Sequence, residues 1–230
     1  MATKKRNRAM VSTPIGVAMF CHLVEPRLSY DKKKMEFEAN LVFDPGDAKF
    51  AEFQQMMMDF AQEYLKTAEI PDKVDLDNLR IRLPIRDHTD RDKVPTGEKS
   101  LRVKGNSEYA PRPTPDNPDP KPIIRRLEFF DATGRTKIQD PVEPGNGSRL
   151  RIGVDMVANI FPPQDPEDPS KLYVSLYPRI VQVVELVESR VTPEAYGIGE
   201  VDTEDAFIAN MLDADEGADM DPSAGASPRF

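Results

Sequence analysis

Two segments in the second half of the chain, residues 148–161 and 171–188, alternate cations and tyrosines with aliphatic side chains. Because successive side chains leave a β-strand on opposite sides, this alternation predicts two half-buried strands that pair as an antiparallel hairpin. Their outer face would combine flat aromatic rings with cations, which suits a single-stranded nucleic acid because rings stack on bases and cations contact phosphates. The candidate groups on this face are Arg149, Arg151, Lys171, Tyr173, Tyr177 and Arg179.

Other segments offer the same residue types. The stretch 78–84 alternates leucine and isoleucine with arginine, and the stretch 122–131 reads as a further strand with basic and aromatic positions. These segments add Arg80, Arg82, Arg126 and Phe130 to the candidate single-stranded DNA contacts, and Tyr109, in the irregular stretch 86–122, is a further candidate. The alternative interpretation is that the tyrosines cap the core and the cations only solvate the sheet.

Residues that could perform catalysis do not form a recognisable set. Cys21 and His22 are adjacent in a predicted strand, so they point to opposite faces and cannot share a metal ion. Asp87, Asp90 and Asp92 resemble a carboxylate metal site, but interleaved basic residues favour a solvated, salt-bridged loop. The sequence has no GxSxG motif and no phosphate-binding loop. We therefore expect no enzyme activity, no metal site and no cofactor, and a metal-dependent nuclease is the least favoured hypothesis.

Composition describes a polar chain rich in proline. There are 230 residues with 31% charged side chains, 22 prolines and one cysteine, which excludes an internal disulfide. No apolar run approaches the roughly 20 residues that a membrane span requires, and the basic start is not followed by the apolar core of a secretory signal. These features predict a soluble protein without membrane association.

The formal net charge of −9 is concentrated at one end of the chain. Residues 200–230 hold nine acids and one base, Arg229, so residues 1–199 are close to neutral at −1. We expect a basic flexible arm over 1–9 and a disordered acidic tail over 190–230. The tail would occupy the cationic face when DNA is absent and bind partner proteins when DNA displaces it, unless it serves only to solubilise the protein. Its candidate partner-binding residues are Phe207, Met211, Asp213, Asp215, Glu216, Asp219, Asp221 and Phe230.

The remaining patterns place these residues on one domain over 10–189. Alternation predicts strands at 10–24 and 33–43, and an apolar stripe predicts a helix over 47–67 that begins at Asp47. Residues 86–122 read as a long, mobile, proline-rich insertion, whose middle, SLRVKGNSEYAP, is compatible with one short strand or hairpin edge. The order predicts a mainly β fold, an OB-type barrel of about five to seven strands with one helix after the first hairpin and long inserted loops. A flat sandwich is the alternative.

Two stretches resemble a known family. TPIGVAMFCHLVEP, and KIQDPVEPGNGSRLRIGVDMVANIF followed by KLYVSLYPRIVQVVELV, are similar to the first hairpin and last barrel strands of replicative single-stranded DNA-binding proteins of short-tailed phages. The resemblance implies an OB fold with an acidic tail, action in the cytoplasm of an infected bacterium, and a tail that contacts the phage DNA polymerase and helicase-primase through a terminal phenylalanine. A homodimer is a further arrangement that it allows. This chain departs from the pattern because Arg229 precedes Phe230 and no acid lies in the last nine residues.

Two hypotheses follow. The first is a non-catalytic protein that coats single-stranded DNA during phage replication, recombination and repair. The second is an acidic interaction or scaffold module whose barrel binds protein. Charge reversal at Arg149, Arg151 and Lys171 distinguishes them, because it would change DNA binding only under the first hypothesis.

Overall fold

The structure is a computed structural model that describes residues 7–30, 33–71, 74–90, 92–109, 111, 113–114, 117–162 and 168–188. Its larger compact unit spans residues 1–189. The predicted acidic tail over 190–230 and its candidate residues lie outside the described part of the chain. No helix among the described residues is long and apolar enough to cross a membrane.

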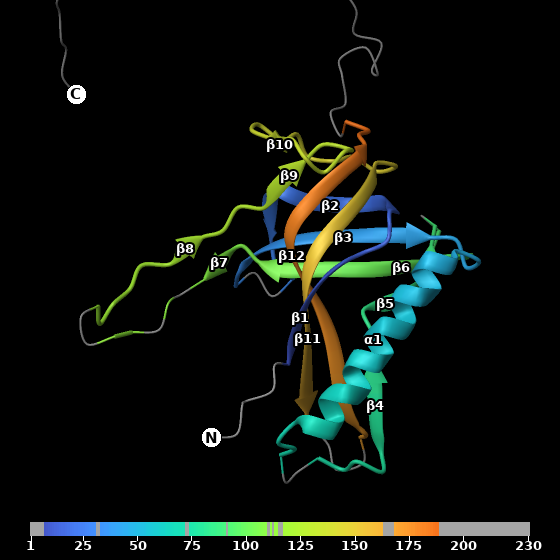
Figure 1. The fold of residues 1–230 in the computed structure, drawn as a ribbon, viewed down its shortest axis with the longest axis vertical. Coiled ribbons are helices and arrows are strands. Elements are labelled where there is room, and N and C mark those ends of the chain that lie inside the picture. The colour runs from blue at the N-terminus through green and yellow to red at the C-terminus, as the bar shows by residue number, and fades with distance from the viewer. Residues whose placement is uncertain are drawn as a thin grey trace, which may run out of the picture. The chain divides into compact units, whose positions relative to one another are not determined.

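Across the described residues the fold is mainly β, with one helix (Figure 1). The helix and the strands that form the main sheet are β1 (Arg8–Ser12), β2 (Gly16–Leu28), β3 (Met35–Phe43), α1 (Ala48–Thr67), β4 (Leu79–Arg82), β5 (Ile85–Thr89), β6 (Pro95–Asn106), β9 (Glu128–Phe130), β10 (Lys137–Ile138), β11 (Arg149–Phe161) and β12 (Ser170–Glu185). A separate two-stranded ribbon pairs β7 (Glu108–Tyr109) with β8 (Ile123–Ile124).

The main sheet follows the order β10-β9-β12-β11-β2-β3-β6-β5 and curls into an OB-type barrel. β4 pairs in parallel with β12, and β1 pairs with β11. β6 and β12 are not hydrogen-bonded neighbours in this order, yet they pack closely: a Cβ added at Gly105 of β6 would lie 3.1 Å from Cδ of Pro178 in β12. The seam between these two strands is where the candidate site lies.

The helix packs one apolar face against the core of the barrel, because its apolar residues recur at helical spacing. Asp47 caps the N-terminus, its side-chain oxygen accepting the backbone N–H groups of Lys49 and Phe50 at 2.8 and 3.1 Å. The ring of Phe50 stacks on Phe43 of β3 with centroids 4.5 Å apart. The buried positions of the helix are Phe50, Phe53, Met57 and Ala61. The predicted helix and its cap are therefore confirmed.

The opening of the chain differs from the single strand predicted over 10–24. The strand is interrupted at Thr13–Ile15, which gives two strands that both pair with β11. β1 pairs along 153–157 and β2 at 149–150. Thr13 holds the corner, since its N–H donates to the carbonyl of Ile152 and its Oγ1 accepts the N–H of Ile152. Pro14, between the two strands, has no N–H to donate to a ladder. Arg8 and Ala9 belong to β1, so the predicted flexible arm does not extend to residue 9.

A larger correction concerns the insertion predicted over 86–122. Residues 85–89 and 95–106 form the β5–β6 hairpin, and β6 pairs with β3 from Lys99 to Asn106. The prediction of a mobile insertion is therefore wrong for these residues. Only Leu101 and Val103 in β6 show the aliphatic alternation, while lysines, arginines and glycines elsewhere in the strand obscure the pattern.

A β-bulge in β12 changes the second predicted strand. Val154 of β11 pairs with Pro178 and Gly153 pairs with Ile180, which leaves Arg179 without a partner on β11. The extra residue reverses the alternation, so Val181 is buried and Ile180 is 41% exposed. Ile180 therefore faces outward, although the alternation predicted for residues 171–188 would place it on the core face with Leu176.

One glycine position should be sensitive to any added side chain. A Cβ at Gly16 in β2 would lie 2.6 Å from Cζ of Phe43 and 2.9 Å from Cβ of Leu41. Both partners are buried, so Gly16→Ala is expected to lower the free energy of unfolding by about 1–3 kcal/mol through overpacking. Urea denaturation measures the change. Gly46→Ala is the matched control because its Cβ would meet nothing within 4 Å, and equal stability of the two variants would contradict the prediction.

Candidate nucleic-acid interface

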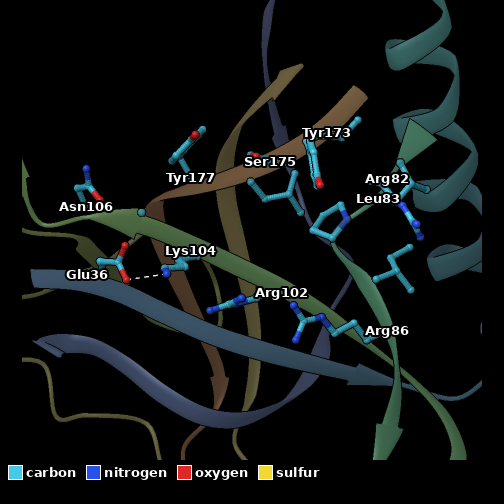
Figure 2. Close-up of a pocket in the computed structure, with 15 residues that line it drawn as sticks. Glu36, Arg82, Leu83, Arg86, Arg102, Lys104, Asn106, Tyr173, Ser175 and Tyr177 are labelled. Atoms are coloured by element: carbon cyan, nitrogen blue, oxygen red, sulfur yellow. Dashed lines mark ion pairs between the residues drawn. The ribbon is translucent and has the colours of Figure 1, made fainter. Parts of the chain in front are cut away.

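A groove with a volume of about 660 Å³ runs along the seam between β6 and β12 (Figure 2). One wall is the face of β12 that carries Tyr173, Ser175 and Tyr177. The other is built from β6 and from the corner between β4 and β5, at residues 82–86. The groove residues that can recognise a charged or aromatic ligand are Arg82, Arg86, Arg102, Lys104, Asn106, Tyr173 and Tyr177.

The two tyrosines are held at a fixed spacing by β12. They lie four positions apart along one strand, so their Cα atoms are about 13 Å apart. The Tyr173 side chain is 40% exposed and meets Phe161 edge-on, with ring centroids 5.7 Å apart. Tyr177 packs where β6 passes closest, since a Cβ at Gly105 would lie 3.4 Å from its Cδ1. Each ring therefore has a neighbour that orients it while part of its surface remains open to the groove.

The cations of the groove fall into two groups. Arg102 and Lys104 of β6 are ion-paired, with 2.6 Å from Arg102 Nε to Glu38 Oε1 and 2.7 Å from Lys104 Nζ to Glu36 Oε2. Arg82 and Arg86 make no ion pair with any residue in the described ranges, and both are exposed. These two arginines therefore carry charge that is available to an anionic ligand.

A smaller hollow of about 190 Å³ adjoins the groove and shares Gly105, Asn106 and Tyr177 with it. It adds Arg125, Arg126 and Arg179 to the basic lining. The Arg125 guanidinium also lies 5.1 Å from the ring centre of Tyr109 in β7, a cation–π contact. The basic and aromatic surface thus continues from the groove towards the β7–β8 ribbon.

Two buried carboxylates lie beside this surface. Glu38 on β3 bonds Arg27 and Arg102, and Asp155 on β11 bonds Arg8 and Arg179. Burial alone would raise the pKa of each carboxyl group, but the hydrogen bonds and charges of the paired arginines outweigh it. The pKa of Glu38 and the pKa of Asp155 are therefore held below their ordinary values.

These pKa shifts predict loss of stability in acid. A carboxyl group whose pKa is lower in the folded state contributes stability above its unfolded pKa of about 4, and that contribution is lost as the pH falls through the folded value. The urea midpoint of the wild type should therefore drop steeply below about pH 4. Asp155→Asn should be less stable than wild type at neutral pH and show a shallower decline in acid. Parallel pH profiles for the two proteins would contradict this.

The predicted site residues separate into three sets. Arg82, Tyr173 and Tyr177 line the groove, and Arg126 and Arg179 line the adjoining hollow. Arg80 of β4 pairs with Lys171 of β12, two residues before Tyr173. Tyr109 lies in β7, in the two-stranded ribbon. None of these three lines either space, and the same holds for Arg149, Arg151 and Phe130.

Register explains why Arg149 and Arg151 lie elsewhere. They pair with Glu185 and Gln182, beyond the bulge and at the opposite end of β12 from Tyr173. Alternation predicted which side chains of β11 and β12 face outward, but it did not predict which part of that outward face lines the groove. Phe130 lies on β9, opposite Lys137 of β10 and Gln182 of β12.

Several groove residues escaped the sequence prediction, namely Arg86, Arg102, Lys104, Asn106 and Arg125. Four of them lie within the stretch assigned to an irregular insertion. The signal that identifies two of them is the short alternation of Leu101 and Val103 with Arg102 and Lys104, since cations between buried aliphatics indicate a strand with one basic face.

Among the described residues, no group of three or more histidine, cysteine and acidic side chains is arranged to hold a metal ion. Cys21 is buried, and this burial, with the nearby charge of Glu143, raises the pKa of its thiol to about 12. The thiol therefore stays protonated at neutral pH, and a protonated thiol is a poor metal ligand.

The fold and groove define a class: an OB-type β-barrel with one helix and a basic, tyrosine-bearing cleft. No family model matches the sequence, and comparison with curated proteins finds no relative. Among solved structures, the chain shares its fold with gp2.5, a single-stranded DNA-binding protein of bacteriophage T7. The TM-score is 0.54 at 14% identity, over 85% of this chain and 97% of gp2.5. The fold implied by the sequence resemblance is thus confirmed.

A second set of solved structures is more distant. The single-stranded DNA-binding protein of bacteriophage Enc34, in a C-terminally truncated form, gives a TM-score of 0.47 at 11% identity over 81% of this chain and 94% of that one. The same protein in complex with single-stranded DNA gives 0.45 at 12% identity, over 81% and 95% of the two chains.

Proposed function

We propose that this protein binds single-stranded DNA without catalysis and coats it during phage DNA replication and recombination, in the cytoplasm of an infected bacterium. The observation that carries the proposal is the groove between β6 and β12, which Tyr173 and Tyr177 line together with Arg82 and Arg86, two cations that have no ion pair within the described ranges. Rings stack on bases of any sequence, and arginines follow the phosphates. The shared fold with gp2.5 of phage T7 supports this proposal.

The groove favours a single strand over a duplex for a physical reason. In double-stranded DNA the base faces are stacked on one another, so the two tyrosines have no base plane to contact. Single-strand affinity should fall with salt, with a log–log slope of about −0.7 for each phosphate contacted. Filter binding with labelled oligothymidine and with a duplex of equal length tests the proposal. An absence of single-strand affinity at low salt would reject it and favour the scaffold hypothesis.

The acidic tail belongs to the same proposal. Residues 200–230 carry nine acids, whereas the exposed arginines of the groove are cationic. A polyanion tethered to the barrel competes with DNA for this surface, and release by DNA leaves Phe207, Met211 and the terminal Phe230 free to bind the replicative polymerase and helicase-primase. The opposite charge of tail and groove supports this assignment.

Removal of residues 200–230 is therefore expected to tighten oligothymidine binding several-fold at low salt. The difference should shrink as salt rises, because screening weakens the competing attraction. Titration of labelled DNA with full-length and truncated protein at two salt concentrations measures both effects. Equal or weaker binding by the truncated protein would argue against competition, even if both proteins bind DNA.

A further inference from the structure

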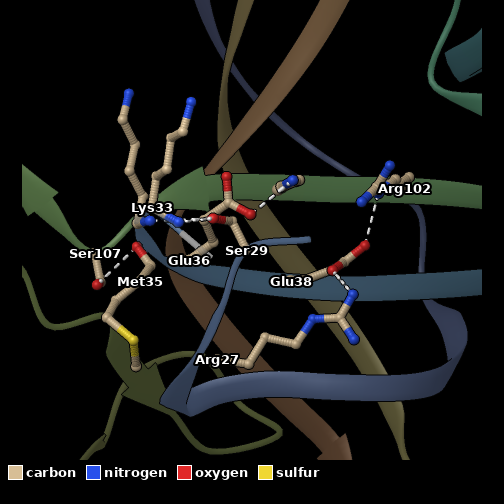
Figure 3. Close-up of polar contacts among 10 residues, drawn as sticks. Arg27, Ser29, Lys33, Met35, Glu36, Glu38, Arg102 and Ser107 are labelled. Carbon is tan, nitrogen blue, oxygen red and sulfur yellow. Dashed lines mark hydrogen bonds and ion pairs between the residues drawn. The ribbon is translucent and has the colours of Figure 1, made fainter. Parts of the chain in front are cut away.

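The carboxylate of Glu38 is enclosed between two arginines from neighbouring strands (Figure 3). Glu38 lies on β3, Arg27 on β2 and Arg102 on β6, and the pairing of the three strands places both arginines one step diagonally from Glu38. Only 6% of the Glu38 side chain is exposed, against 31% for Arg102 and 49% for Arg27. The acid is thus buried beneath two cations that remain in contact with solvent.

Only one of the two arginines lines the groove. Arg102 does so, and it donates its Nε to Glu38 Oε1 at 2.6 Å. This bond fixes the plane of the guanidinium and uses one of its five N–H donors, so the donors on the terminal nitrogens remain for a ligand. Arg27 lines neither the groove nor the adjoining hollow and bonds the other oxygen of the same carboxylate.

The charges of this group explain why two arginines are present. A carboxylate paired with Arg102 alone would orient that arginine but cancel its charge, which weakens attraction for a phosphate. The second arginine leaves the three-residue group with one net positive charge. Arg102 is therefore held in place, while the three-residue group keeps one positive charge that attracts a phosphate.

Asp155 is likewise paired with two arginines, although both of them bond Oδ2 and Oδ1 has no hydrogen-bond partner among the described residues. Its carboxylate, 2% exposed, bonds Arg179, which lines the smaller hollow, and Arg8 of β1, which lines neither space. The four arginines come from four different strands, β1, β2, β6 and β12. A buried carboxylate between two arginines thus occurs twice beside the basic surface. In each case one arginine lines the groove or the hollow and the other lines neither.

We propose that Glu38 is a positioning residue for single-stranded DNA, holding Arg102 towards the phosphates, and that Arg27 restores the positive charge that Glu38 removes. This proposal rests on the proposed function, because it assigns roles within the same groove. Arg27 thereby supports DNA binding without touching the DNA.

A charge-matched double variant separates positioning from net charge. Glu38→Gln/Arg27→Gln keeps the single net positive charge of the group but replaces the ionic bond that fixes Arg102 with at most a weaker, neutral amide contact. We expect oligothymidine binding to weaken about eightfold at 50 mM salt and the log–log salt slope to fall by about 0.7, the loss of one phosphate contact. Arg27→Gln alone should also weaken binding, since it leaves Arg102 held in a neutral pair.

The control is a charge-matched change at an ion pair outside the groove. Glu128→Gln/Lys137→Gln removes the 2.7 Å pair between β9 and β10 and should leave both affinity and slope unchanged. Wild-type protein is titrated first: if it does not bind, the proposed function fails. If it binds, two results together would overturn the positioning role. The Glu38→Gln/Arg27→Gln protein would bind with the affinity and salt slope of the wild type, and the Glu38→Gln protein would bind more tightly than the wild type.

Folding is checked independently by thermal unfolding of each variant. If the double variant does not fold, Arg102→Lys replaces it, because this change leaves Glu38 paired with Arg27 and preserves the charge. Lysine lacks the forked guanidinium, so the lysine variant should bind more weakly and with a smaller salt slope. An Arg102→Lys protein that binds like the wild type would overturn the proposal.

Discussion

Replacing Tyr173 and Tyr177 together with alanine should weaken oligothymidine binding by about 30-fold or more. Each stacked base contributes roughly 1–3 kcal/mol, and two lost contacts at the lower limit give about 2 kcal/mol. The salt slope should not change, because the rings contact bases and release no counterions. Titration of labelled DNA at several salt concentrations measures affinity and slope in one experiment.

The choice of control depends on ring exposure. Tyr30, at the turn between β2 and β3, is fully exposed and lines neither the groove nor the hollow, so Tyr30→Ala should bind as wild type. Replacing the groove tyrosines with phenylalanine keeps the stacking surface and should restore most of the affinity. Loss of affinity in the phenylalanine protein, or none in the alanine protein, would show that the rings do not stack on bases.

Replacing Arg82 and Arg86 with alanine should produce a loss of similar size but of a different kind. These arginines have no ion pair among the described residues, so their removal breaks no internal contact of that type. If each contacts one phosphate, the slope should fall by about 1.4 and the affinity by about 60-fold at 50 mM salt. The deficit should narrow as salt rises, whereas the deficit of the tyrosine variant should persist.

The matched control for this variant is Arg149→Ala/Arg151→Ala. It removes the same charge from the same barrel, but at the far end of β11 and outside the groove. A weak effect there and a strong one at Arg82 and Arg86 would locate the DNA on the β6–β12 seam. Equal losses in the two double variants would show that the barrel attracts DNA by overall charge without a defined path.

Much of the fold could be predicted because local patterns determined it. The alternation in 148–161 and 171–188 identified β11 and β12 and their pairing, and Asp47 identified the start of the helix. β6 was predicted only in part, as one short strand or hairpin edge within residues 100–111, because its apolar positions are few and its outer face consists of the cations that line the groove. The residues that form the site therefore concealed the strand that carries them.

The candidate site was less predictable for two physical reasons. Alternation assigns a side chain to a face, but only the pairing register decides which part of that face meets another strand. Arg149 and Tyr173 share an alternation pattern and a hairpin, yet they lie at opposite ends of it. The bulge at Arg179 then reversed the pattern, so that the periodicity predicted the wrong face for Ile180. The enclosure of Glu38 depends on three strands at once, which no single stretch of sequence reveals.

The composition of the groove also has a consequence for how the protein folds. One wall comes from residues 82–86 and 102–106 and the other from residues 173–177, so a long stretch of chain separates the two walls. Such non-local contacts form slowly, because closing a long loop costs entropy before the contacts stabilise it. Binding competence should therefore appear only in the last phase of refolding, after the helix and the β2–β3 hairpin. A chain still being synthesised would remain unable to bind DNA until β12 had left the ribosome.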